Sequence, residues 1–260
     1  MTSELRRWVR ASFLRLGWDV RRVQSIERIR WQRYHDEMFE QWRFMKNYGF
    51  RSILDIGANT GVWATFAREI LPEAKIYSFE PLAECYAELF AQQAKLQPAE
   101  AFHCALGEEN GTATIHRNKS TVSSSLLPMN SLHWEELPQT VETTDEQITV
   151  RRLDDVFADR PLESPFFVKI DVQGFEDRVL RGGSKTIRTA AAVVLEMSSF
   201  RLYEEQPLFD DLYPVLRDWG FVYRGNVGQW ISHRDGRILQ FDGLFENTDF
   251  PPGEQPPSRT

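Results

Sequence analysis

The segment Ile53–Gly61, which reads Ile-Leu-Asp-Ile-Gly-Ala-Asn-Thr-Gly, constrains the fold more than any other part of the chain. A short apolar run that ends at glycine predicts a buried strand, and the residues after it predict the start of a helix. Gly57 lets the backbone turn tightly where a ligand approaches it. In doubly wound sheets, the open end of a parallel strand that meets a helix N-terminus is the usual site for a nucleotide-like ligand. The segment therefore predicts an α/β protein with such a site.

Strands and helices alternate along most of the chain. Strands are predicted at 52–56, 75–79, 100–105, 166–172, 191–197, 221–224 and 238–245, and helices at 62–71, 82–95, 175–182 and 207–219. This alternation favours a parallel sheet covered by helices on both faces. In the middle, residues 112–117 and 147–152 have the pattern of exposed antiparallel strands. The Ser- and Thr-rich segment 119–145 between them predicts a long loop or mobile flap.

Composition divides the chain into three parts. Residues 1–48 predict an N-terminal helical appendage, residues 49–249 the α/β domain, and the Pro-rich residues 250–260 a disordered tail. Residues 1–34 hold nine Arg against three acidic residues, although the whole chain has a net charge of −7. The acidic remainder argues against a broad nucleic-acid-binding face. Two scattered cysteines make no disulfide framework, which favours a reducing cytoplasm, and no apolar run is long enough to span a bilayer.

The glycine loop does not have the pattern of a dinucleotide site. That fingerprint would place glycines at 57, 59 and 62, but Asn59 and Val62 stand at two of these positions. Glu80, at the end of the second predicted strand, follows Gly57 by 23 residues, close to the usual interval of about 20. An acidic side chain there accepts hydrogen bonds from ribose hydroxyls. The alternatives are a purely structural turn at Gly57 and a helix-initiating acid at Glu80.

Three charged residues interrupt the later apolar strands. Strand alternation places Lys169 and Asp171 on one face, and Phe166, Val168 and Ile170 on the other. Such charges are costly unless they interact or serve a site, so Lys169 is either a structural ion-pair partner or part of that site. Glu196 ends the next strand, so Asp171 and Glu196 are expected to open onto one cleft. There they share general-base work or hold a divalent cation, although zinc is disfavoured because no His lies beside them.

An ordered set of motifs resembles the FkbM family of methyltransferases. The motifs are Asp-Ile-Gly-Ala-Asn-Thr-Gly (55–61), Phe-Glu-Pro (79–81), Ala-Leu-Gly (105–107), Lys-Ile-Asp-Val-Gln-Gly-Phe-Glu (169–176), Val-Leu-Arg-Gly-Gly (179–183) and Leu-Glu (195–196). Each is weak alone, but six in order are specific, and together they cover about residues 50–245.

The resemblance implies a class I methyltransferase (Rossmann-like) fold, with a seven-stranded sheet whose last strand is antiparallel. It implies S-adenosylmethionine as the methyl donor and a hydroxyl oxygen as the acceptor, often on a sugar, a glycan or a polyketide-type natural product. Carried over by position, the loop after the first strand would hold the methionine end of the cofactor. The end of the second strand would hold its ribose, and residues 105–106 would flank its adenine. The cofactor-binding residues implied are Asp55, Gly57, Asn59, Thr60, Gly61, Glu80, Pro81, Ala105 and Leu106.

Our hypothesis for the chemistry is that Asp171 removes the hydroxyl proton, with Lys169 and Glu196 supporting it. One rival is a metal-assisted reaction with Asp171 and Glu196 as ligands. Another is a non-catalytic cofactor-binding or scaffold protein, whose basic N-terminal arm docks a glycosyltransferase or a membrane surface. A nicotinamide oxidoreductase is a distant third. The sequence leaves open the acceptor and the oligomeric state, for which a dimer is one option.

Overall fold

The computed structural model of the chain describes residues 26–250, so residues 1–25 of the predicted helical appendage and residues 251–260 of the predicted tail lie outside the described residues. The chain divides into two compact units between Glu40 and Gln41, earlier than the predicted boundary after residue 48. Helix α2 (Ile26–Trp42) and the short helix η1 (Arg43–Asn47) cover the described part of the predicted appendage. The boundary differs because Trp42 and Met45 are buried in the core of the second unit.

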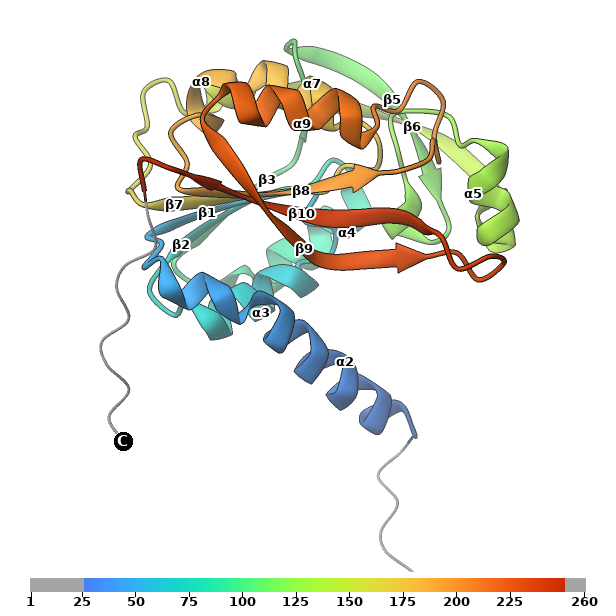
Figure 1. Cartoon of the computed structure of the whole chain (residues 1–260), viewed down its shortest axis with the longest axis horizontal. Helices are drawn as coiled ribbons and strands as arrows, with labels where there is room; N and C mark the ends of the chain where they lie inside the picture. Colours follow the sequence, from blue (N-terminus) through green and yellow to red (C-terminus); the bar gives the residue numbers. More distant parts are fainter. Residues whose placement is uncertain (1–25, 251–260) are drawn as a thin grey trace, which may run out of the picture. The chain divides into compact units, whose positions relative to one another are not determined.

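The second unit is built on a seven-stranded sheet (Figure 1). Its strands are β1 (Ser52–Ile56), β2 (Lys75–Phe79), β3 (Ala99–Phe102), β7 (Phe166–Ile170), β8 (Ala192–Ser198), β9 (Phe221–Ile231) and β10 (Ile238–Asn247), in the order β3-β2-β1-β7-β8-β10-β9. Neighbouring strands from β3 to β8 are parallel, and β10 pairs antiparallel with both β8 and β9. The expected class I sheet with an antiparallel last strand is confirmed.

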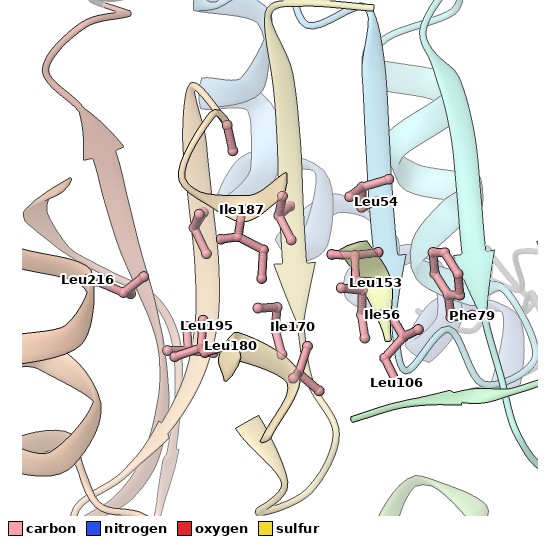
Figure 2. Close-up of a cluster of buried hydrophobic side chains, with 14 of the residues drawn as sticks. Leu54, Ile56, Phe79, Leu106, Leu153, Ile170, Leu180, Ile187, Leu195 and Leu216 are labelled. Atoms are coloured by element: carbon pink, nitrogen blue, oxygen red, sulfur yellow. The ribbon is translucent and has the colours of Figure 1, made fainter. Parts of the chain in front are cut away.

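Helices cover both faces of this sheet, as the alternation predicts (Figure 1). They are α3 (Val62–Ile70), α4 (Ala83–Gln92) and η2 (Gln93–Lys95) in the first half, and α6 (Leu153–Val156), α7 (Glu176–Gly182), α8 (Ser184–Ile187) and α9 (Phe209–Asp218) later. Figure 2 shows Leu180, Ile187 and Leu216 from the later helices meeting the apolar side chains of β1, β7 and β8. Within residues 26–250, no helix is long and apolar enough to cross a membrane.

The predicted strand 100–105 is wrong at its end, because the chain leaves the sheet after Phe102. Ala105 and Leu106 instead form β4 (Ala105–Leu106), which pairs with β6 (Thr143–Arg151) in a second sheet. This sheet has the order β4-β6-β5, and β5 (Gly111–Asn118) pairs antiparallel with β6, as the pattern in the middle of the chain predicts.

The predicted loop 119–145 contains short helices rather than irregular chain alone. These are η3 (Thr121–Ser123), α5 (Ser131–Glu136) and η4 (Pro138–Thr140). The segment is held at its start by Asn118, whose side chain is fully buried and whose Nδ2 donates to the Thr140 carbonyl at 2.6 Å. Elements of this length show no periodicity, so buried polar contacts rather than an apolar pattern determine where they lie.

Candidate active site

A cavity of about 360 Å³ opens at the carboxyl ends of β1, β2, β7 and β8. Loop residues after these strands form its floor, and β4 with the segment 121–137 forms one wall. Trp230 and Gln240, from β9 and β10, complete the lining. A partly open cavity therefore lies at the edge of the sheet where the sequence predicts the site. None of the described residues that line it is Lys or Arg, whereas Glu80, Asp171 and Glu196 are acidic.

Gly57 is where the first loop crosses the chain after β7. Its φ is +83°, and a Cβ atom built there would lie 1.9 Å from the carbonyl oxygen of Asp171. Only glycine fits this crossing. Asn59 also has a positive φ, of 48°, and its side-chain oxygen accepts a hydrogen bond from the Thr60 N–H at 2.9 Å. Asn tolerates this conformation better than most residues. The loop thus exposes backbone to the cavity beside β1.

Glu80 ties the end of β2 to this loop. One carboxylate oxygen accepts a hydrogen bond from the Leu82 N–H and the other from the Asn59 N–H, each at 2.8 Å. Burial raises the pKa of Glu80 to about 7, against the opposing effect of these two donors. Each oxygen keeps a second acceptor direction. Glu80 therefore has a structural role and still faces the cavity as a possible partner for hydroxyl groups.

Lys169 lies beneath the cavity rather than in its lining. Its Nζ is 3.0 Å from Asp171 Oδ2 and 3.8 Å from Asp55 Oδ1. Burial lowers the pKa of Lys169, but the nearby carboxylates outweigh this effect and raise it, so the side chain is a cation. Asp55 is fully buried, and neither of its oxygens has a hydrogen-bond partner within residues 26–250. Burial raises its pKa to about 6, and the Lys169 charge opposes that rise.

Asp171 and Glu196 lie in one cleft, as expected, and a residue that the sequence analysis does not single out joins them. The Gln173 Nε2 lies 2.9 Å from Asp171 Oδ1, and 3.1 and 2.9 Å from the two oxygens of Glu196. Burial would raise the pKa of Asp171, but Lys169 and the Gln173 amide outweigh it and lower that pKa. Burial and the neighbouring carboxylates raise the pKa of Glu196 well above its ordinary value.

This arrangement does not favour the metal-assisted alternative. The Gln173 amide group presents N–H donors to Asp171 and Glu196 from the place where a shared cation would need to lie. No three His, Cys, Asp or Glu side chains in the described part of the chain are grouped so that they could hold a metal ion. Hard divalent cations normally require several oxygen ligands.

The predicted cofactor residues fall into two groups. Gly57, Asn59, Glu80, Pro81, Ala105 and Leu106 line the cavity. The others support the loop from behind. A Cβ at Gly61 would lie 2.8 Å from Leu89 of α4, so that glycine allows close packing. The Thr60 carbonyl accepts a hydrogen bond from Gln92 at 2.8 Å, and Asp55 pairs with Lys169.

Four further residues at the site were not predicted. His133 and Trp230 line the cavity with Gln240, and the Tyr203 hydroxyl donates to Gln173 Oε1 at 2.9 Å. They come from α5, β9, β10 and the loop after β8, and each stands alone in the sequence. No motif in the sequence around His133 indicates a function for it.

Comparison with known proteins agrees with this geometry. A sequence profile described as the methyltransferase FkbM domain matches residues 55–223. The chain belongs to the FkbM methyltransferase family. The expected resemblance is confirmed, and the FkbM match runs from Asp55 in β1 to Tyr223 in β9, so it includes most of the cavity.

Three relatives show how far the similarity extends. The chain is 32% identical over 167 residues to the 2-O-methyltransferase NoeI of Sinorhizobium fredii, a match that covers 59% of the chain and 66% of NoeI. It is 30% identical over 193 residues to methyltransferase sdnD of Sordaria araneosa, and this match covers 64% of the chain and 74% of sdnD. It is 29% identical over 151 residues to the 31-O-demethyl-FK506 methyltransferase FkbM of Streptomyces tacrolimicus, and this match covers 50% of the chain and 58% of that protein. The match to NoeI thus spans just under two thirds of that protein.

Proposed function

We propose that this protein transfers a methyl group from S-adenosylmethionine to a hydroxyl oxygen of a sugar, a glycan or a natural product. The observation that carries the proposal is the cavity itself, in which the glycine loop and Glu80 meet acidic side chains, and no Lys or Arg is among the described lining residues. Such a lining suits a ligand with a positively charged sulfonium. The names of two relatives, a 2-O-methyltransferase and a 31-O-demethyl-FK506 methyltransferase, support oxygen as the acceptor atom.

In this proposal the residues of the site divide the cofactor among them. The loop at Gly57 and Asn59, which lines the cavity beside β1, holds the methionine end. Glu80, with Pro81 beside it, accepts hydrogen bonds from the ribose hydroxyls. Ala105 and Leu106 pack against the adenine from β4.

The cofactor supplies an electrophilic methyl group, and the chain must align the acceptor oxygen and remove its proton. Asp171 as the proton acceptor stays a prediction. Its pairing with Lys169 lowers its pKa, which keeps it ionised but makes it a weak base. We therefore propose that Asp171 orients the acceptor by accepting a hydrogen bond from a hydroxyl beside the one that is methylated, and that Lys169 and Glu196 hold Asp171 and Gln173 in place.

Two measurements test the proposal. Calorimetry with S-adenosylmethionine should give saturable binding, and mass spectrometry after incubation with labelled donor should find the label on a neutral glycan or alcohol.

Two variants test the roles of single residues. Asp171→Asn should lose turnover while it keeps cofactor binding, and Glu80→Gln should weaken cofactor binding. Turnover that disappears with EDTA would restore the metal-assisted reaction. Cofactor binding without transfer to any acceptor would favour the scaffold alternative.

We also propose that the protein acts in the cytoplasm. Cys85 and Cys104 are both free and buried, which suits the reducing cytoplasm expected from their small number.

A further inference from the structure

His133 is held in one orientation and one tautomer. It lies on α5, is 1% exposed and lines the cavity. The Thr140 hydroxyl donates to the Leu137 carbonyl at 2.7 Å, so its oxygen is left to accept the His133 Nδ1–H at 3.0 Å. With the proton on Nδ1, the imidazole Nε2 carries a lone pair. The ring therefore presents an acceptor to whatever lies at Nε2.

The neighbour of this nitrogen does not use its lone pair. Tyr203 Oη is 3.4 Å from His133 Nε2, but its closer contacts are Gln173 Oε1 at 2.9 Å and the Ser123 carbonyl at 3.2 Å. A phenol has one proton to give. Because the amide nitrogen of Gln173 faces the two carboxylates, its oxygen faces Tyr203 and takes that proton. Nε2 thus stays open next to the group that joins Asp171 and Glu196.

A second polar group in the same cavity lacks a partner. Gln240 is 6% exposed, and its Nε2 is buried with no hydrogen-bond partner among the residues that the structure describes. Register pairs Gln240 of β10 with Trp230 of β9, whose ring meets the edge of His133 at 5.9 Å between centroids. A buried amide donor without a partner is costly, so a ligand oxygen is the expected partner.

These three side chains indicate what kind of ligand the cavity binds. Trp230 offers an apolar surface, Gln240 a donor and His133 an acceptor, which suits a ring that carries a hydroxyl and a neighbouring oxygen. The acidic lining without Lys or Arg disfavours anionic acceptors such as phosphates or carboxylates.

We propose that His133 Nε2 accepts the proton of the methyl-acceptor hydroxyl, while Gln240 holds a neighbouring oxygen of the same neutral ring. This inference rests on the proposed O-methyl transfer. In the step, the acceptor oxygen forms a bond to the methyl carbon, and the carbon–sulfur bond breaks with its electron pair going to sulfur. The hydroxyl proton moves to His133, which becomes an imidazolium and later releases the proton to water. No other reactant is needed.

The surroundings keep His133 in the basic form. Burial lowers the pKa of His133, so the ring is neutral at neutral pH. Among the described residues, Tyr203 from the loop after β8 lies 3.4 Å from its Nε2, and Glu80, Asp171 and Glu196 line the same cavity. Glu136, on the same helix, is occupied, because its carboxylate accepts hydrogen bonds from the Ser232 hydroxyl and the His233 N–H.

The first test needs no turnover. Nitrogen-15 NMR of the imidazole rings in the full chain, with S-adenosylhomocysteine bound, should show His133 neutral at pH 7 with the proton on Nδ1. Addition of trans-1,2-cyclohexanediol, a neutral ring with adjacent hydroxyls, should shift the Nε2 signal. A proton on Nε2, or a charged ring at pH 7, would overturn the proposal.

The second test uses the acceptor found by product analysis. His133→Gln should lower kcat by about 10²–10⁴-fold, the usual contribution of a general base, with unchanged S-adenosylhomocysteine affinity. His133→Ala should regain part of that rate with added imidazole, which a packing role would not produce. His116→Gln is the matched control, because His116 pairs with Asp145 on the second sheet. Gln240→Leu should raise the KM for the acceptor more than it lowers kcat.

The outcomes separate this proposal from the proposed function. A His133→Gln enzyme within threefold of the wild-type kcat would remove His133 from the chemistry and leave O-methyl transfer intact. A wild type that binds S-adenosylmethionine but methylates nothing would end the proposed function, and the NMR result would still decide whether Nε2 is an open acceptor.

Discussion

At the scale of single residues, the crossing of two loops at Gly57 is the tightest constraint in the site. The Asp171 carbonyl occupies the place of a Cβ, so the loop that faces the cofactor and the loop that carries Asp171 share one contact. A side chain at position 57 would push apart the two halves of the cavity. If the proposed function holds, we expect this backbone contact to couple cofactor binding to acceptor alignment.

We predict that Gly57→Ala destabilises the fold by about 3 kcal/mol or more, since the methyl group meets backbone that cannot move aside easily. Gly49→Ala is the matched control. Gly49 also has a positive φ, of +61°, but no atom lies within 4 Å of its Cβ position, so it should cost only about 1–2 kcal/mol. Thermal unfolding of both variants checks the difference. Equal losses of stability in the two variants would mean that the positive φ, rather than the collision with the Asp171 carbonyl, determines the cost.

The Glu80 carboxyl should make stability depend on pH. Its pKa is about 7 in the fold and near the ordinary value of 4.5 in the unfolded chain, so the folded state binds more protons between these values. Its contribution is present at low pH and is lost as pH rises through 7. Between pH 5 and 8, the unfolding free energy of wild type should fall by about 2 kcal/mol more than that of Glu80→Gln. Denaturant titrations at both pH values measure this; parallel curves would contradict it.

Sequence reasoning found the residues whose place follows from strand order alone. Glu80, Asp171 and Glu196 each end a predicted strand, and parallel strands bring their carboxyl ends to one edge. Gln173 and His133 could not be found in this way. Their roles depend on a left-handed turn at Gln173 and on a helix outside the sheet, and neither leaves a pattern in the sequence.

At the scale of elements, the strands of the large sheet were predictable because buried parallel strands are short apolar runs between helices. The predicted strand 221–224 is too short, because β9 continues to Ile231 against β10. The other error occurs where the pairing changes partner. The apolar residues at 105–106 continue the run from β3, and only the register with Val150 and Arg151 shows that they belong to the second sheet. The segment after Asn118 was unpredictable for another reason: hydrogen bonds to buried Asn, Ser and Thr place it, and these residues are typical of loops as well.

Asn118 should control whether this segment forms its side of the cavity. Its side chain donates to the Thr140 carbonyl and accepts from the Ser120 N–H at 2.8 Å. Asn118→Ala should cost about 2 kcal/mol and increase hydrogen exchange in residues 119–142. Transfer to the acceptor should fall more than cofactor affinity. Asn110→Ala, an exposed position whose side chain also accepts a backbone N–H, should leave exchange in that segment unchanged.

At the scale of the whole molecule, the division between Glu40 and Gln41 places every site residue in the second unit. The sequence suggested a boundary after residue 48, because a helical pattern runs from about Val20 to that point. The pattern does not reveal that Trp42 packs edge-on against Trp63 and Phe167, with ring centroids 5.1 and 6.2 Å away.

We predict that a chain beginning at Gln41 keeps the cofactor affinity and unfolding temperature of the full chain's second unit. A chain beginning at Gly49 should unfold at a much lower temperature, because it loses two buried side chains, Trp42 and Met45. Trp42→Ala in the full chain should cost about 3–5 kcal/mol. Calorimetric unfolding of the three proteins distinguishes the boundaries, and equal stability of both truncations would support the one after residue 48.

The carboxylate lining without Lys or Arg bears on how the enzyme finishes a cycle as well as on how it begins one. Methyl donation turns a sulfonium into an uncharged thioether, so the attraction that brought the donor in disappears once the reaction is over. If the proposed function holds, the spent donor is held mainly by its adenosine and amino-acid contacts, so we expect it to leave more readily than the fresh donor. Salt screens charges, so raising its concentration should reduce the difference in affinity between the two.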